Sequence, residues 1–205
     1  MSTIVALGDS TTAGTPGFRS PVEAPPDGAG DVQSQFAYWL MQAHPDWRVL
    51  NRGVNGERSD EIAARVARDV VAAQPEVVIV IAGVNDVYQG RSAGDVQRQL
   101  TAIYDAARAA SIAIVAGSII PYNTATPAQN AAMHAINHWI HEHAAAHADS
   151  MVFCDTRAAV AAPGAPDRLV SSPDDLHPSP QGYKLMAAAL DSAVAAALAK
   201  ARALR

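Results

Sequence analysis

Residues 3–11 read TIVALGDST, and this stretch decides the fold because an apolar, β-branched run stops abruptly at Gly8, Asp9 and Ser10. A short apolar run without polar alternation is typical of a strand buried on both faces, as in a parallel sheet. A serine at the end of such a strand is placed to face a crevice rather than the core. Small polar residues also end or cap many elements, so this stretch alone predicts the strand and leaves the role of Ser10 open.

Four later runs have the same character and predict further buried strands. They are Arg48 to Leu50, Val77 to Ile81, Ile112 to Ala116 and Met151 to Cys154. Between them, apolar residues recur every three or four positions, which predicts helices that cover a sheet. One helix begins at a Ser59 cap and carries Ile62, Val66 and Val70, a second follows Ser92, and the last starts at Ser179-Pro180. Five strands separated by helices predict an α/β fold with a five-stranded parallel sheet.

The chain has 205 residues, which is enough for one good core and little above the usual size of a domain. Because no internal repeat and no composition shift marks a boundary, we expect a single domain over residues 1–205. The most irregular stretch, Gly14 to Gly30, is rich in glycine and proline. Long irregular segments in compact domains are usually functional or disordered, and we expect this one to shape a substrate pocket.

The composition is 49% hydrophobic and 17% charged, with a formal net charge of −5, which indicates a globular protein. It offers no basic field for nucleic acid or an anionic membrane surface, so neither is an expected partner. The first apolar run, Ile4 to Leu7, is too short for a signal-peptide core or a membrane span. We therefore expect no membrane span and a cytoplasmic location, or a secreted one if a signal peptide has been removed. The single cysteine, Cys154, permits no disulfide framework, and its apolar surroundings predict a buried thiol.

A second polar feature lies near the other end of the chain, where Asp174-Asp175-Leu176-His177 places a carboxylate three residues before an imidazole. A serine hydroxyl becomes a nucleophile at neutral pH when a neutral imidazole within hydrogen-bond reach removes its proton. A carboxylate on the far side of the ring fixes its tautomer and stabilises the imidazolium. Of the seven histidines, only His177 follows a carboxylate in a proline-bounded loop. This pattern indicates a serine, aspartate and histidine array, with Asp175 competing with Asp174 for the carboxylate position.

Two further loops offer hydrogen-bond donors for an oxyanion, which acyl transfer from an ester requires. Asn51 to Gly56 follows the second strand, and Gly56 would let its backbone N–H approach a substrate closely. Gly83-Val84-Asn85-Asp86 follows the third strand, and the Asn85 amide is a donor that does not titrate. Each is also compatible with an ordinary turn.

Two other interpretations are weaker on chemical grounds. His134, His138 and His141 share one helical face, but no H-E-x-x-H pattern or adjoining cysteine accompanies them, so we expect a solvated face and no functional metal. A non-catalytic α/β ligand-binding module would cradle phosphate on glycine-rich turns. The sequence around Gly8 lacks the G-x-G-x-x-G spacing and a Walker lysine, and it carries a carboxylate where phosphate would lie. We expect no cofactor.

Taken together, the four blocks at 8–10, 51–56, 83–86 and 174–177 resemble those of the SGNH (GDSL-type) hydrolases, in the same order and over most of the chain. The resemblance implies a flavodoxin-like, three-layer α/β/α sandwich. It implies Ser10 as nucleophile, with His177 and Asp174 completing a catalytic triad and Asp175 left as a solvated loop charge. It also implies an oxyanion hole made of the Ser10 N–H, the Gly56 N–H and the Asn85 side chain, with Gly53 as the competing glycine.

The resemblance extends to a class of reaction but not to one substrate, because the family handles lysophospholipids, acyl thioesters, aryl esters and acetylated sugars with the same blocks. We expect a carboxylic ester hydrolase, of esterase, thioesterase or lysophospholipase type, that acts through an acyl-enzyme on small acyl esters. A carbohydrate O-acetyl esterase is the alternative. Loop positions suggest the residues of the substrate-binding wall, which are Phe18, Arg19, Tyr88, Tyr122 and Asn123. The oligomeric state stays open.

Overall fold

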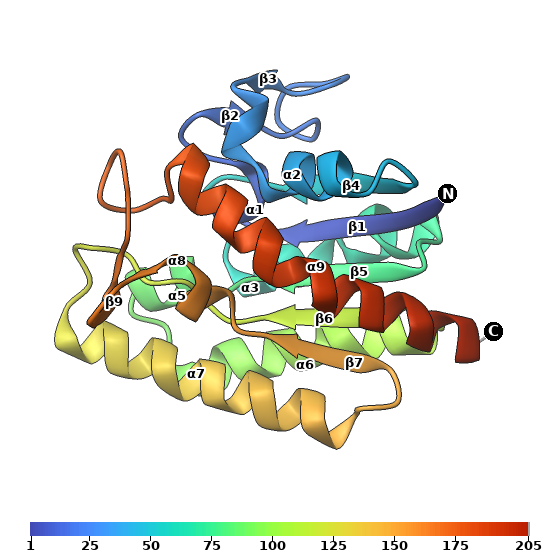
Figure 1. The fold of residues 1–205 in the computed structure, drawn as a ribbon. Coiled ribbons are helices and arrows are strands. Elements are labelled where there is room, and N and C mark those ends of the chain that lie inside the picture. Colours follow the sequence, from blue (N-terminus) through green and yellow to red (C-terminus); the bar gives the residue numbers. More distant parts are fainter. Residues whose placement is uncertain (205) are drawn as a thin grey trace.

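The computed structural model describes residues 1–204 and contains a central sheet of five parallel strands in the order β4-β1-β5-β6-β7. The strands are β1 (Ser2–Gly8), β4 (Trp47–Gly53), β5 (Val77–Ile81), β6 (Ala113–Gly117) and β7 (Met151–Cys154). All five predicted strands and the parallel sheet are confirmed. In the register, Gly8 at the end of β1 lies beside both Gly53 and Ile81. The carboxyl ends of three neighbouring strands therefore meet at one edge, on the left in Figure 1.

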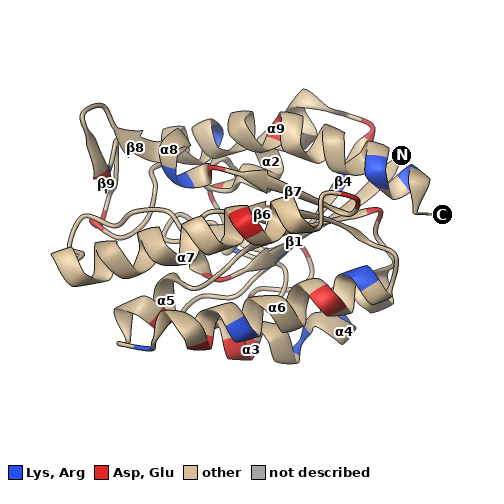
Figure 2. Cartoon of the chain, turned by 90° about the horizontal axis from the view of Figure 1, so that it is seen from below, with Lys and Arg blue, Asp and Glu red and all other residues tan. Residues whose placement is uncertain are grey.

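Helices cover both faces of this sheet, so the predicted three-layer α/β/α sandwich is confirmed. Ile4 and Ala6 of β1 belong to a core shared with α2 (Phe36–Ala43) and α9 (Pro180–Ala203). Val5 and Leu7 point the other way, towards α3 (Ser59–Ala64), α4 (Val66–Asp69), α6 (Ala93–Ala109) and α7 (Pro127–Ala146). Figure 2 shows α2 and α9 on one side of the sheet and α3, α4 and α6 on the other.

Two of the predicted helix starts are confirmed and one is wrong. The Ser92 hydroxyl caps α6 at the Asp95 N–H, and the Ser179 hydroxyl caps α9 at the Gly182 N–H. Ser59, in contrast, is the first residue inside α3 and not its cap, because its N–H and hydroxyl both bind Asp86. The predicted single helix is also divided at Arg65, whose φ of −106° and ψ of 3° separate α3 from α4.

The irregular stretch after β1 contains a small antiparallel ribbon of β2 (Phe18–Arg19) and β3 (Ala29–Gly30). At Gly30, φ is 115° and an added Cβ would lie 2.2 Å from the Gly17 carbonyl oxygen, so the ribbon requires glycine there. The ribbon is followed by η1 (Val32–Ser34) and α2. We call residues 14–30 the excursion.

Short elements complete the chain at the same edge and at the periphery. They are α1 (Ser10–Ala13), η2 (Val71–Ala73), α5 (Val84–Tyr88), α8 (Thr156–Val160), β8 (Ala161–Ala162) and β9 (Ala165–Leu169). α1 and α5 directly follow β1 and β5, so both begin at the carboxyl edge of the sheet.

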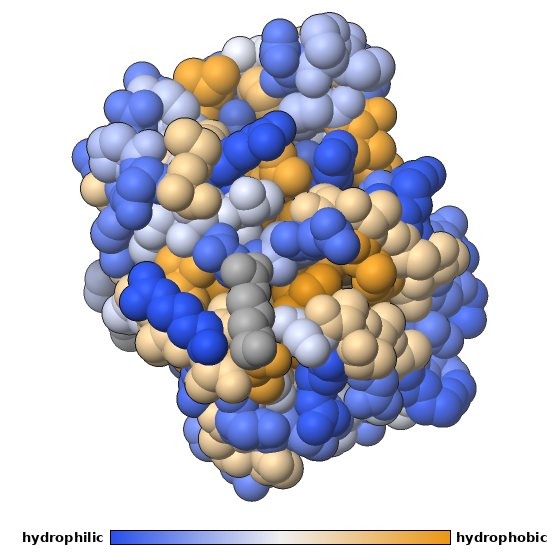
Figure 3. Space-filling model, turned by 90° about the vertical axis from the view of Figure 1, so that its right-hand side faces the viewer, coloured by the Kyte–Doolittle hydropathy of each residue, from blue (hydrophilic) through white to orange (hydrophobic). Residues whose placement is uncertain are grey.

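Helix α9 is long and apolar enough, by length and composition alone, to cross a membrane, but half of its apolar window is buried inside the protein. Tyr183, Met186 and Leu190 on this helix belong to the core against the sheet. We therefore interpret α9 as a core helix. Its far end lies near the chain's first residues, on the side away from the carboxyl edge (Figure 1), where the surface mixes hydrophilic and apolar areas (Figure 3).

Candidate active site

Ser10 occupies the first position of α1, immediately after the strand that leads the chain to the carboxyl edge. Asp9 caps this helix, since its Oδ1 accepts a hydrogen bond from the Thr11 N–H at 2.9 Å. The first N–H groups of a helix have no intrahelical acceptor, so the Ser10 N–H is available at the same point as its hydroxyl. Local capping thus fixes both groups of Ser10.

A chain of hydrogen bonds joins Ser10 to a loop 167 residues further along the sequence. The Ser10 Oγ lies 2.9 Å from Nε2 of His177, and Nδ1 of His177 lies 2.8 Å from Oδ2 of Asp174. The other carboxylate oxygen, Oδ1, accepts hydrogen bonds from the Leu176 and His177 N–H groups at 3.0 and 2.8 Å. Burial raises the pKa of Asp174, but these hydrogen bonds outweigh it and leave the pKa below its ordinary value. Asp174 therefore stays ionised beside the ring at neutral pH.

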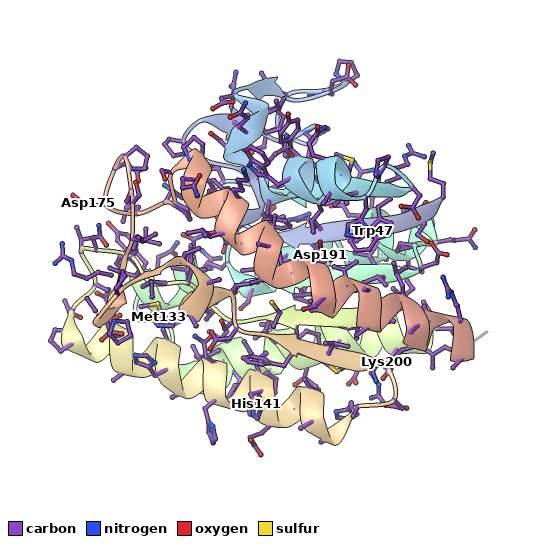
Figure 4. The ribbon with its side chains drawn as sticks, in the orientation of Figure 1. Trp47, Met133, His141, Asp175, Asp191 and Lys200 are labelled. Atoms are coloured by element: carbon purple, nitrogen blue, oxygen red, sulfur yellow. The ribbon has the colours of Figure 1, made fainter. Side chains whose placement is uncertain are left out.

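The histidine loop is fastened by Asn123, which we expected in the substrate wall. The Asn123 N–H donates to the Asp175 carbonyl at 2.8 Å, and its side-chain amide donates to Asp175 Oδ1 at 2.9 Å. Its side-chain oxygen accepts from the Leu169 N–H at 2.8 Å. Asn123 is not among the residues that line the cavity at Ser10, and its polar groups bind the histidine loop and the end of β9. Asp175, which Figure 4 labels on that loop, is exposed and accepts the Asn123 hydrogen bond with one carboxylate oxygen.

The predicted oxyanion donors lie on two loops that are bonded to each other. Asn85, in the first turn of α5, donates one side-chain N–H to the Glu57 carbonyl at 2.8 Å and keeps its second N–H. Gly56 adopts a φ of 78°, and a Cβ there would meet nothing within 4 Å, so its surroundings are open. Within residues 1–204, no group accepts a hydrogen bond from the Gly56 N–H, whereas the Gly53 N–H donates to Asn51 Oδ1 at 3.0 Å. The geometry therefore favours Gly56 over Gly53 as a donor.

Arg65 holds the carboxyl ends of two strands together and was not anticipated from the sequence. Its guanidinium is 6% exposed and donates to the Gly8 and Arg52 carbonyls, both at 2.8 Å. It also pairs with Glu57 at 2.6 Å and with Asp69 at 2.7 Å. An arginine in a predicted helix gives no local sign of such partners. Its paired, buried charge stabilises the junction from which Ser10 and Gly56 emerge.

Asp9 is a second buried ionisable group that the sequence analysis did not place in the site. Burial is the main cause that raises its pKa to about 7, and the nearby Asp86 raises it further, while the hydrogen bonds from Thr11 and the charge of Arg65 lower it. Its second oxygen, Oδ2, has no hydrogen-bond partner among residues 1–204. The residue beside Ser10 thus carries a carboxyl that gains a proton easily.

A cavity of about 190 Å³ opens directly over Ser10. It is lined by Ser10, Thr11, Asn55, Val84, Asn85, Tyr88, Ile120, Tyr122, Leu176 and His177. The predicted wall residues Tyr88 and Tyr122 both reach it, and their rings pack edge to face with centroids 6.0 Å apart. Tyr122 is 2% exposed and Tyr88 is 58% exposed, so one forms the inner wall and the other the rim.

Phe18 and Arg19, the other two predicted wall residues, are not among the residues that line this cavity. Both lie in β2, and pairing with β3 in the ribbon carries them away from Ser10. The Phe18 ring is buried beside Gly28, and Phe18 faces a separate depression next to Arg48 and Leu50. Loop order alone could not show where the ribbon turns.

Two histidines of helix α7 are paired with carboxylates, one from β9 and one from α7 itself. His134 is 2.7 Å from Asp167, and His141 is 3.0 Å from Glu142. Within the described residues 1–204, no group of three or more histidine, cysteine or carboxylate side chains is placed to hold a metal ion. Cys154 is buried as predicted, and burial raises the pKa of its thiol to about 11.

The fold and site together are of the class of α/β/α hydrolases that carry a serine, a histidine and an aspartate at the carboxyl edge of a parallel sheet. The family model described as the GDSL-like lipase/acylhydrolase family matches residues 6–185. The chain therefore belongs to the GDSL-like lipase/acylhydrolase family, and it is a hydrolase of ester bonds. This confirms the resemblance found in the sequence.

Solved structures agree with this assignment of the fold. A protein of the G-D-S-L lipolytic family from Desulfitobacterium hafniense is similar with a TM-score of 0.77 and 22% identity, covering 94% of this chain and 99% of its own. One from Veillonella parvula has a TM-score of 0.76 and 17% identity, with 92% and 95% covered. An acetylxylan esterase from Geobacillus stearothermophilus has a TM-score of 0.72 and 22% identity, with 94% of each chain covered. A comparison with curated proteins found no match.

Proposed function

We propose that this protein hydrolyses small carboxylic esters through an acyl-enzyme on Ser10, with His177 as general base and Asp174 as its orienting carboxylate. The observation that carries the proposal is the continuous hydrogen-bond chain from Asp174 through His177 to Ser10, at 2.8 and 2.9 Å. A carboxylate on Nδ1 places the proton-accepting Nε2 on the serine side, as general-base catalysis requires.

In the first half of the reaction, His177 takes the Ser10 proton while Oγ attacks the ester carbonyl carbon. The carbonyl oxygen becomes an oxyanion, which would be received by the Ser10 N–H, the Gly56 N–H and the second N–H of Asn85. His177 then returns the proton to the leaving alcohol. In the second half, a water molecule loses its proton to His177 and attacks the acyl-enzyme, which releases the acid and restores Ser10.

The size and lining of the cavity favour substrates with a short acyl group. Its volume of about 190 Å³ is below the roughly 300–1,000 Å³ of common small-molecule sites. Val84, Ile120, Tyr122 and Leu176 give it an apolar wall. Burial of each methylene in such a wall contributes about 0.8 kcal/mol until the space is filled, so affinity should rise with chain length and then fall.

A carbohydrate O-acetyl esterase is the second candidate. The small cavity suits an acetyl group, and the exposed Asn55 at the cavity offers an amide to a sugar hydroxyl. The acetylxylan esterase from Geobacillus stearothermophilus shares the fold. This candidate predicts that acetylated xylo-oligosaccharides are hydrolysed with a higher kcat/KM than p-nitrophenyl acetate.

The deciding experiment measures hydrolysis of p-nitrophenyl esters from acetate to decanoate, and of acetylated xylo-oligosaccharides, by the wild-type protein and Ser10→Ala. A chelator is added in parallel reactions. Activity that resists the chelator and disappears in Ser10→Ala supports the proposed mechanism, and the best substrate separates the two candidates. Equal activity of the wild-type protein and Ser10→Ala would refute the proposed mechanism.

A further inference from the structure

The excursion does not contribute the wall residues we expected, but it contacts the loop that carries Gly56. The Ser20 hydroxyl donates to the Gly53 carbonyl at 2.5 Å, and Ser20 is fully buried. The same hydroxyl accepts from the Val22 N–H, and the Ser20 carbonyl accepts from the Glu23 N–H. Ser20 therefore organises a turn in the excursion and joins that turn to the end of β4.

The turn presents Glu23 to the next part of the same loop. Oε1 of Glu23 accepts a hydrogen bond from the Asn55 N–H at 3.1 Å, across 32 residues of sequence. Its other oxygen, Oε2, is buried and has no hydrogen-bond partner among residues 1–204. Burying one oxygen of the Glu23 carboxylate without a hydrogen-bond partner costs solvation free energy. The hydrogen bond from the Asn55 N–H to Glu23 is therefore formed at an energetic cost.

Gly56 lies between this contact and a second one. On its carboxyl side, the Glu57 carbonyl is held by Asn85 and the Glu57 carboxylate by Arg65. On its amino side, the fixed group is the Asn55 N–H on Glu23. Gly56 itself is exposed and has a left-handed φ of 78°, and an added Cβ there would meet nothing within 4 Å. It lies in a turn that the Glu57 N–H closes on the Val54 carbonyl at 3.4 Å. Its direction therefore depends on this long turn hydrogen bond and on the two contacts that flank it.

We infer that Glu23, supported by Ser20, is a positioning residue for the oxyanion hole, which it serves by holding Asn55 so that the Gly56 N–H points at the developing oxyanion. This role rests on the proposed function. The carboxylate acts through geometry, because a negative charge near the oxyanion would by itself oppose the reaction. A neutral acceptor of the same shape should therefore replace it.

The test compares Glu23→Ala and Glu23→Gln with Asp27→Ala, a matched control that removes an exposed carboxylate from the same excursion. We measure kcat per titrated active site, KM, and the Ki of a trifluoromethyl ketone whose adduct carries an oxyanion. Glu23→Ala should lower kcat roughly tenfold, less than the hundredfold or more for a deleted donor, with KM within twofold. The Ki should rise by the same factor as kcat falls. Glu23→Gln and Asp27→Ala should stay within about threefold of wild type.

Hydrogen exchange at the Asn55 amide provides a readout that does not depend on activity. Glu23→Ala should speed exchange of this amide, because the Asn55 N–H loses its acceptor, and Asp27→Ala should not. Unchanged exchange and unchanged kcat per site in Glu23→Ala would overturn the positioning role. A wild-type protein without esterase activity would instead refute the proposed function, while the exchange comparison would still decide whether Glu23 orders the loop.

Discussion

In the proposed mechanism the chemistry depends on Ser10, whose hydroxyl lies at the end of the hydrogen-bond chain. Ser10→Ala removes the attacking oxygen and leaves the cap of α1, which Asp9 provides, in place. We expect kcat to fall by about four powers of ten or more, with the circular dichroism spectrum unchanged. Ser111→Ala, an exposed control, should keep wild-type kcat. Comparable activity of Ser10→Ala and wild type would exclude Ser10 as nucleophile.

In the proposed mechanism Asn85 differs from Ser10, because it would contribute only by stabilising the negative charge of the oxyanion. Asn85→Ala removes an oxyanion donor and also the hydrogen bond to the Glu57 carbonyl. We expect kcat to fall by roughly two to three powers of ten, while KM changes little, because the donor binds the transition state more strongly than the substrate. Steady-state kinetics with p-nitrophenyl butyrate measures both constants. A rise in KM with unchanged kcat would show that Asn85 binds the substrate instead.

Asp9 predicts a pH dependence of stability, since burial raises its pKa from 3.8 to about 7 in the folded protein. Between about pH 4 and 7, the folded state therefore keeps a proton on Asp9 that the unfolded state has already lost. This stabilising contribution is fully present below the unfolded pKa, and it is lost as the pH rises through the folded pKa of about 7. By linkage, the loss is on the order of 4 kcal/mol.

Asp9→Asn tests this at the same residue, because the amide keeps an acceptor for the Thr11 N–H and cannot ionise. Urea unfolding at pH 5 and pH 8 should show a smaller loss of stability in Asp9→Asn than in wild type. Asp27→Asn, an exposed control, should behave like wild type. The same pH dependence in all three proteins would mean that Asp9 has an ordinary pKa in the folded state.

At the scale of elements, the loop before α9 is held by Asn123 from another loop, which makes two hydrogen bonds to Asp175 and a third to Leu169 at the end of β9. Asn123→Ala should loosen the loop, and we expect kcat to fall roughly tenfold through misplacement of His177. Asn123→Asp keeps the size but places a carboxylate against Asp175, so its kcat should be lower still. A lower kcat in Asn123→Asp than in Asn123→Ala is the expected result. A lower kcat in Asn123→Ala would contradict the role of Asn123 in holding the loop.

The elements that the sequence predicted correctly are those whose cause is local. The five strands follow from β-branched, apolar runs that only a buried sheet accommodates, and Ser92 and Ser179 cap helices whose first turns lie beside them. The contacting pair Ser10 and His177 could also be foreseen, because the required chemistry singles out one histidine. These predictions needed no knowledge of distant partners.

The elements predicted wrongly depend on partners far along the chain. Ser59 does not cap α3 because Asp86, 27 residues later, takes its N–H and hydroxyl. Phe18 faces a separate depression and not the cavity at Ser10, because the ribbon pairs it with Gly30. Arg65 was missed because the strand carbonyls it binds carry no side-chain signal. In each case, a contact between residues far apart in the sequence determines the residue's position, and the local sequence pattern does not reveal that contact.

At the scale of the whole molecule, the cavity is a joint product of segments that are remote in sequence. Tyr88 comes from α5, Tyr122 from the segment after β6, and Leu176 from the loop before α9. Tyr122→Ala removes the ring at the inner wall and enlarges the cavity. The preferred p-nitrophenyl ester should then have an acyl chain about two to four carbons longer. Tyr88→Ala opens the rim and should shift it less. An unchanged chain-length profile in both variants would exclude them as walls.

The bond between His177 and Ser10 joins the first strand to the loop that precedes the last helix. A ribosome makes Ser10 when only the first of the five strands has been synthesised, and His177 only after all five. If Ser10 and His177 act as we propose, a nascent or truncated chain holds a serine without its base, and we expect no ester cleavage before the tertiary structure is complete. Esterase activity is then a direct report of finished folding, and its recovery during refolding would time the docking of the last helix onto the sheet.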